Sequence, residues 1–144
     1  MKYPRALIWV ALIIQWLGMA YDFAWHGLIS PDFEATTAPE MVRHLGTVHV
    51  PLYIGVALTF LATAWALIVH LRRGEHGKAI PIAFLGSVIQ VVGEAWHASS
   101  HLRMSPHVGP LAFSVSFVGM LIVLGALILG GRAERRAHRL LTHP

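Results

Sequence analysis

The sequence predicts an all-α integral membrane protein made of four transmembrane helices. Of its 144 residues, 56% are hydrophobic and only 12% are charged, with a mean hydropathy of +0.60. A soluble domain of this size has too little interior to bury so much apolar surface, and soluble proteins are about one-quarter charged. Four apolar stretches complete the prediction, because each is near the ~20 residues that a helix needs to cross a bilayer.

The four spans are expected over residues 6–26, 44–70, 79–101 and 107–130. The first contains Asp22 and lacks a small-residue cleavage site before a polar segment, so it is interpreted as a span and not as a signal peptide. Residues 37–40 form a capping-box pattern with a proline in the first turn, which predicts that the second helix begins before it enters the membrane. Residues 131–144 are a polar, basic tail, so the chain is expected to be a single four-helix domain.

The basic residues predict the orientation of the spans. Arg43 and Arg103 stand apart from the other nine of the eleven, which are Lys2, Arg5, Arg72, Arg73, Lys78, Arg132, Arg135, Arg136 and Arg139. The positive-inside rule then places both termini and the loop 70–78 in the cytoplasm of a cell whose inner (plasma) membrane holds the protein. The lipid bilayer is the expected partner, a membrane complex or homo-oligomer stays open, and nucleic-acid binding is excluded.

An internal repeat is predicted from a shift of 75 positions. Residues 14–31 then lie over residues 89–106 without a gap, with seven identities in 18 positions. The shared residue types are Ile, Gln, Gly, Ala, His, Ser and Pro, most of them polar or conformationally special. The sequence therefore favours two helical hairpins of the same orientation, packed as a four-helix bundle.

Ten histidines are unusual in so apolar a chain, and their positions predict a site. The chain has no cysteine, which excludes disulfides, thiolate ligands and iron–sulfur clusters. Four histidines fall on the cytoplasmic side and are interpreted as interfacial or solvated: His70, His76, His138 and His143. The other six share the outer ends of the four spans with two carboxylates, which gives the candidate metal ligands Asp22, His26, His44, His49, Glu94, His97, His101 and His107.

The spacing of these groups favours a common metal site. Asp22 and His26 are four residues apart, as are His97 and His101, so each pair shares one helix face, and Glu94 falls on the face of His97. Ionisable groups are costly at membrane depth, and bundles build metal sites from side chains on facing helices. Mixed histidine and carboxylate ligation suits copper, iron or zinc, bound as one ion or two.

One local pattern resembles a known copper site. Asp22 and His26, followed by a histidine of the second span, resemble the Asp-x3-His…His copper-binding pattern in the integral membrane subunit of particulate methane and ammonia monooxygenases. The resemblance covers these three residues, and the second spacing is longer here. It implies a copper ligand set in the first half of the chain.

Three functions remain open from the sequence. The first is a membrane oxidoreductase or oxygenase-like metalloprotein that acts on a lipophilic substrate, with Glu94 or Asp22 as bridging ligand or general base. The second is a haem b protein for quinol-linked electron transfer, in which His26 pairs with His101, or His44 with His107. The third is a metal or proton transporter, against which the few polar groups in the inner halves of the spans argue.

The aromatic, amide and glycine residues near the site receive simpler interpretations. Tyr21, Trp25, Tyr53 and Trp96 are expected to form an interfacial aromatic belt. Gln15 and Gln90 lie deeper and are expected to hydrogen-bond across the bundle or to support the site. The glycines that recur near the candidate ligands are expected to be points of close helix packing: Gly18, Gly46, Gly93 and Gly109.

Overall fold

The computed structural model describes residues 2–104 and 109–142, and this part of the chain is helical and contains no strand. In order, the elements are α1 (Lys2–Ala24), the π-helical turn η1 (Trp25–Ile29), α2 (Ala38–Leu45), α3 (Val50–Arg72), α4 (Ala79–Leu102) and α5 (Gly109–Thr142). Four helical stretches are long and apolar enough to cross a membrane: Pro4–Ile29, Val50–Arg72, Ala79–Leu102 and Pro110–Ala133. The all-helical prediction with four apolar spans is therefore confirmed.

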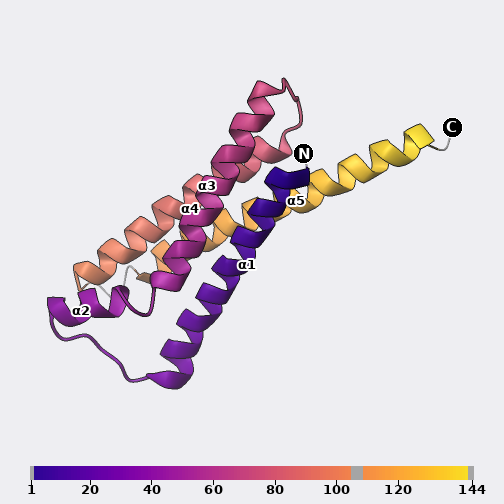
Figure 1. The fold of residues 1–144 in the computed structure, drawn as a ribbon. Coiled ribbons are helices and arrows are strands. Elements are labelled where there is room, and N and C mark those ends of the chain that lie inside the picture. The colour runs from indigo at the N-terminus through magenta and orange to yellow at the C-terminus, as the bar shows by residue number, and fades with distance from the viewer. Residues whose placement is uncertain (1, 105–108, 143–144) are drawn as a thin grey trace.

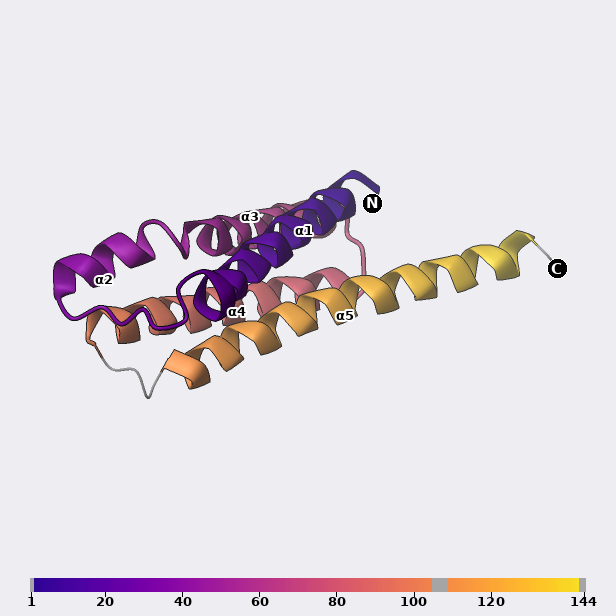
Figure 2. The same cartoon turned by 90° about the horizontal axis from the view of Figure 1, so that it is seen from below.

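The long helices pack as two hairpins joined side by side. α1 packs along α3, α4 packs along α5, and α3 against α4 joins the pairs (Figures 1 and 2). Glycines allow the close approach within each hairpin: a Cβ atom at Gly18 would stand 2.6 Å from the backbone nitrogen of Leu52, and one at Gly93 would collide with the backbone of Ser116. The hairpin pairing agrees with the prediction, while the repeat relation between the hairpins stays a prediction.

The second predicted span is divided into two helices. α2 begins with the expected capping box, in which the Thr37 side chain accepts from the Glu40 backbone and the Glu40 carboxylate accepts from the Thr37 backbone. α2 ends at Leu45, a turn follows, and α3 begins after His49 with Pro51 in its first turn, where a proline needs no backbone donor. The expectation of a continuous helix from residue 44 is wrong, because the chain turns between Gly46 and His49.

Two other helix ends differ from the expected bounds. α1 widens into η1, a π-helical turn that carries His26 and shifts its position relative to a regular α-helix. α5 continues as a helix through the basic segment to Thr142, well beyond the span, and its C-terminal end projects away from the bundle in Figure 1. The segment 131–142 is thus a helical extension of α5.

The interior of the bundle mixes apolar and polar side chains. Apolar residues from all four long helices form the core, among them Ile8, Leu52, Ile80 and Met120. Buried hydrogen bonds join α1 to α3 through Gln15 and Thr59 (3.0 Å) and α3 to α4 through Thr63 and Ser87 (2.7 Å). These bonds fix the register of neighbouring helices. Gln15 bonds within its own hairpin, and the fully buried side chain of Gln90 has no hydrogen-bond partner among the described residues, so the expected bond of these amides across the bundle is not found there.

One histidine at the other end of the bundle is buried, contrary to expectation. His70 is only 4% exposed, and its Nδ1 lies 3.5 Å from Oε2 of Glu75 in the following loop. The interpretation of His70 as an interfacial or solvated group is wrong, because the loop folds back to partner it. His76 is exposed as expected, and the side chains of His138 and His143 lie outside the described part of the chain.

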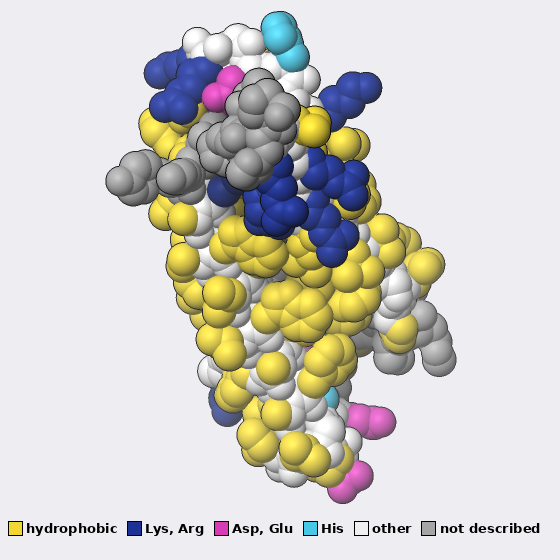
Figure 3. Space-filling model, turned by 90° about the vertical axis from the view of Figure 1, so that its right-hand side faces the viewer, with side chains coloured by type: hydrophobic (Ala, Val, Ile, Leu, Met, Phe, Trp, Pro, Cys, Tyr) yellow, Lys and Arg dark blue, Asp and Glu magenta, His cyan; other side chains and the backbone are white. Residues whose placement is uncertain are grey.

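The surface carries its charges at opposite ends of an apolar belt. Large hydrophobic side chains such as Leu17, Leu61, Leu85 and Leu129 are more than half exposed around the middle of the bundle. Figure 3 shows this apolar surface below a gathering of Lys and Arg side chains. The exposed basic residues lie where α3 ends, α4 begins and α5 leaves the bundle, and they include Arg72, Arg73, Lys78, Arg132, Arg135 and Arg136.

Candidate metal centre

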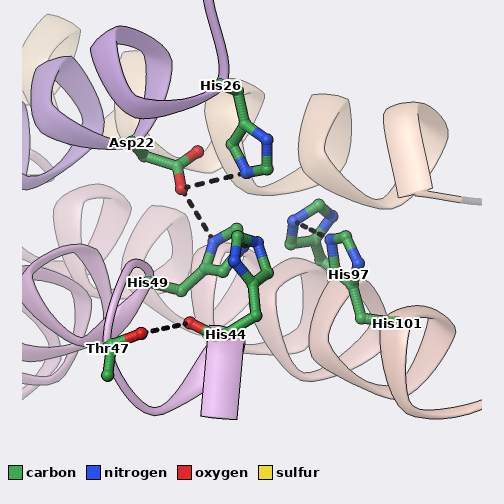
Figure 4. A network of polar contacts seen from close by, with 7 residues as sticks. All are labelled: Asp22, His26, His44, Thr47, His49, His97 and His101. Atoms are coloured by element: carbon green, nitrogen blue, oxygen red, sulfur yellow. Dashed lines mark hydrogen bonds and ion pairs between the residues drawn. The ribbon is translucent and has the colours of Figure 1, made fainter. Parts of the chain in front are cut away.

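Five histidines gather at the end of the bundle that α2 covers (Figure 4). We call them the histidine cluster: His26 of η1, His44 near the end of α2, His49 immediately before α3, and His97 and His101 near the end of α4. They come from three elements and the turn before α3. The turn after α2 brings His44 and His49 together, and the last two turns of α4 bring His97 and His101 to the same level. This convergence agrees with the predicted gathering of histidines at one end of the bundle.

The ring nitrogens within the histidine cluster lie at distances that suit shared ligation of a metal ion. Nε2 of His44 is 3.2 Å from Nε2 of His49, and Nε2 of His97 is 3.2 Å from Nε2 of His101. Two imidazoles on a tetrahedral ion, with bonds of about 2.0–2.1 Å, hold their nitrogens about 3.3 Å apart. Each pair therefore already has the spacing of two neighbouring ligands.

His49 is common to two groups of three histidines. His26, His44 and His49 offer ligand atoms that all lie within 4.8 Å of one another, and His49, His97 and His101 do the same. His49 is 1% exposed, and its ring stands between the others, 4.9 Å from that of His44 and 5.2 Å from that of His101. The site is thus organised around this one imidazole.

Asp22 holds His49 from the α1 side. Oδ1 of Asp22 lies 2.9 Å from Nδ1 of His49 and 3.9 Å from Nε2 of His26. With its proton on Nδ1, His49 donates to this carboxylate and leaves Nε2, the nitrogen that faces His44, available to a metal. A carboxylate behind a ligating histidine fixes the tautomer and orientation of the ring, so Asp22 is placed to orient His49.

Aromatic side chains fix His44 in the cluster. The ring of His44 stacks on Phe33, with centroids 4.7 Å apart and planes 29° apart, and lies 4.7 Å from the ring of Trp25. This burial, together with the neighbouring His49 and His26, lowers the pKa of His44 to about 4. His44 is therefore neutral at physiological pH, which is the form that binds metals.

The metal-free protein is expected to lose stability as the pH falls from about 6.5 towards about 4. Over this range the unfolded chain protonates His44 while the folded chain keeps it neutral, so the unfolded state binds the extra proton and is favoured. The fall in Tm between pH 7 and pH 5 should be a few degrees smaller in His44→Gln than in the wild type. The exposed His76→Gln is the control, and an equal fall in all three proteins would contradict the prediction.

One of the predicted ligands, Glu94, is not part of this arrangement among the described residues. Glu94 is buried one turn below His97, where its carboxylate hydrogen-bonds to Ser116 of α5 and faces a separate small cavity beside Tyr53. Among the described residues it belongs to neither group of three histidines. His107 lies outside the described residues.

Several residues around the cluster differ from their sequence interpretation. Tyr53 is not a belt residue, because its hydroxyl is buried and its ring stacks on His49 with centroids 5.9 Å apart. Trp25 also packs against the cluster, whereas Tyr21 and Trp96 are 43% and 40% exposed, as a belt requires. Tyr53 follows His49 by four residues, so helical spacing could have found it, while Phe33 lies in a loop and carries no such signal.

A cavity of about 620 Å³ opens beside the cluster. Asp22 and all five clustered histidines form part of its wall, and the remainder is mainly apolar. Three ligands in each histidine group leave a coordination position open, and the cavity gives room for a molecule to reach it. The arrangement can thus bind a metal ion and present it to a second ligand.

No protein-family model, curated protein or solved structure matches this chain.

Proposed function

We propose that this protein is an integral membrane metalloprotein whose histidine cluster binds copper, iron or zinc. The observation that carries the proposal is the convergence of five histidines from η1, α2, α4 and the turn before α3, in two groups of three that share His49. A chain gains little from burying so many imidazoles against one another unless a cation joins them, because each buried nitrogen needs a partner. One ion or two can be held by these groups.

The charge distribution supports an orientation for this protein in the plasma (inner) membrane. Exposed Lys and Arg residues surround the end opposite the histidine cluster, whereas Asp32, Glu34 and Glu40 lie in the segment that leads from the cluster into α2. By the positive-inside rule both termini then lie in the cytoplasm. The metal centre opens towards the outer face.

The geometry favours a metal ion over haem b. Axial nitrogens on opposite faces of one haem iron lie about 4 Å apart, twice a metal–imidazole bond, with the macrocycle between them. In the histidine cluster the nitrogen pairs lie 3.2 Å apart and the rings touch at their edges, with centroids 4.6 Å apart for His97 and His101. These contacts leave no slot for a porphyrin between His44 and His49 or between His97 and His101, while the pairing of His26 with His101, or of His44 with His107, stays a prediction.

The cavity on one side of the histidine cluster and the apolar interior on the other favour a catalytic role over transport. The cavity beside the histidine cluster is large enough for a substrate, which suits an oxidoreductase or oxygenase-like protein that acts on a lipophilic molecule. Towards the cytoplasmic end, the interior between Thr63 and His70 holds the fully buried apolar residues Ala66, Ile80 and Ala83. A transmembrane ion path through the described interior would have to cross this apolar layer.

Metal analysis combined with an optical spectrum tests the proposal. The protein purified from membranes should contain one or two equivalents of copper, iron or zinc and show no Soret band. After chelation it should rebind the same metal with the same stoichiometry, and His49→Ala should not. A Soret band would establish haem, and a chain that binds no metal better than His49→Ala does would refute the proposed function.

A further inference from the structure

The cavity beside the histidine cluster has a polar wall and an apolar wall. Asp22 and the five histidines line one side, and Glu34 adds a second carboxylate. The rest of the lining is apolar: Phe23, Phe33, Ala35, Met41, Met104, Pro110 and Phe113. A volume of about 620 Å³ is within the range of small-molecule sites, and methionines adapt readily to the shape of an apolar guest.

The cavity reaches the side of the bundle between α1 and α5. α1 packs on α3 and α5 packs on α4, so these two helices are the outer members of the hairpins, and the end of α1 that leads to η1 diverges from the other helices in Figure 1. Phe23 of α1 and Phe113 of α5 meet edge to face there, with centroids 5.6 Å apart, and both line the cavity. Phe23 is 57% exposed on the surface that would face lipid. Among the described residues, this aromatic pair lies between the cavity and the surface that would face lipid, so an apolar molecule from the bilayer would enter between its two rings.

The charges of the wall favour a neutral guest. Asp22 and Glu34 together balance the charge of one divalent ion, so an anionic head would add a negative charge that nothing compensates, and a cationic head would be repelled by the metal. A neutral hydroxyl can donate to a carboxylate or an imidazole, and its oxygen can approach the metal. Three phenylalanine rings in the lining favour an aromatic body, through edge-to-face contacts.

We propose that this cavity binds a lipophilic phenol, which reaches the metal centre sideways from the bilayer between Phe23 and Phe113. The hydroxyl head points to the histidine cluster, and the ring and tail lie among the phenylalanine and methionine side chains. The proposal rests on the proposed function, because the metal ion provides the position to which the hydroxyl turns.

The test uses the Co²⁺-loaded protein in lipid nanodiscs, titrated with 4-octylphenol. The visible bands of Co²⁺ should change and saturate at one phenol per chain, with empty nanodiscs as the background. The matched probe 4-octylanisole has the same tail with its hydroxyl blocked, and it should bind at least about tenfold more weakly and leave the bands unchanged. Equal binding of the two probes, or a spectrum that 4-octylphenol leaves unchanged, would overturn the proposal.

A pair of variants tests the route. Phe113→Trp adds bulk at the entrance and should weaken 4-octylphenol binding at least about tenfold, measured at saturating Co²⁺ because the ring of Phe113 also lies 5.8 Å from that of His97. Val118→Trp adds bulk on the same helix at a position that is 51% exposed, outside the cavity lining, and should change nothing. Phe23→Trp provides the second entrance variant if Phe113→Trp does not fold. Entrance variants that bind the phenol as Val118→Trp does would refute the route, whereas a wild-type protein that binds neither Co²⁺ nor copper, iron or zinc would refute the proposed function.

Discussion

Replacing His49 with alanine is expected to weaken metal binding by more than about 100-fold, the largest effect of any histidine that the structure describes. His49 is the one residue common to both groups of three, so its loss leaves only pairs: His26 with His44, and His97 with His101. It also removes the imidazole that lies 2.9 Å from Oδ1 of Asp22, which leaves that buried carboxylate without this partner. Competition with a chelator of known zinc or copper affinity measures the change.

Three other substitutions make the result specific to His49. His26→Ala and His101→Ala each remove one group and leave the other intact, so each should lower the affinity or the stoichiometry less than His49→Ala does. His76→Ala removes an exposed histidine from the opposite end and should have no effect. Unchanged helical content in circular dichroism shows that the His49 variant is folded. If His49→Ala and His76→Ala bind metal alike, the cluster does not hold the ion.

The spans and the general location of the site could be predicted from the sequence because both follow local rules. Apolar runs of about 20 residues identify membrane-length helices, and a spacing of four residues identifies His97 and His101 as neighbours on one helix face. The same spacing predicts that Asp22 and His26 are neighbours, and Oδ1 of Asp22 does lie 3.9 Å from Nε2 of His26. The π-helical turn that begins between them could not be predicted in this way. Helical periodicity is therefore enough to predict that two side chains are neighbours when both lie on one helix.

The centre of the site could not be predicted because it depends on contacts between helices. His49 owes its central place to the turn that separates α2 from α3, and the sequence suggested one continuous helix there. Glu94 shares a helix face with His97, but α5 supplies it with Ser116 one turn deeper, so it faces a different cavity. His70 was misjudged for a similar reason, since Glu75 of the following loop folds back onto it. Which neighbour a polar side chain finds is decided by packing, which a single sequence does not display.

Replacing Gly93 with leucine is expected to separate α4 from α5 and to destabilise the protein by roughly 3 kcal/mol or more. Even a Cβ atom at this position would collide with the backbone of Ser116, and leucine adds three more carbons where two helix backbones touch. In lipid, helices gain little from apolar burial, so this close backbone contact is a main source of the stability of the pair. Thermal unfolding in detergent measures the loss.

Gly125→Leu is the matched control for Gly93→Leu. Gly125 lies in α5, and a Cβ atom there would meet nothing within 4 Å, so leucine should be tolerated or slightly stabilising. Gly93 precedes His97 by one helical turn, and a shift of α4 there should also move His97 and His101 away from His49. Gly93→Leu should therefore lose metal affinity together with its stability, while Gly125→Leu keeps both. Equal unfolding temperatures for the two variants would contradict the predicted clash at Gly93, and equal metal affinities would show that the α4–α5 contact does not position the metal centre.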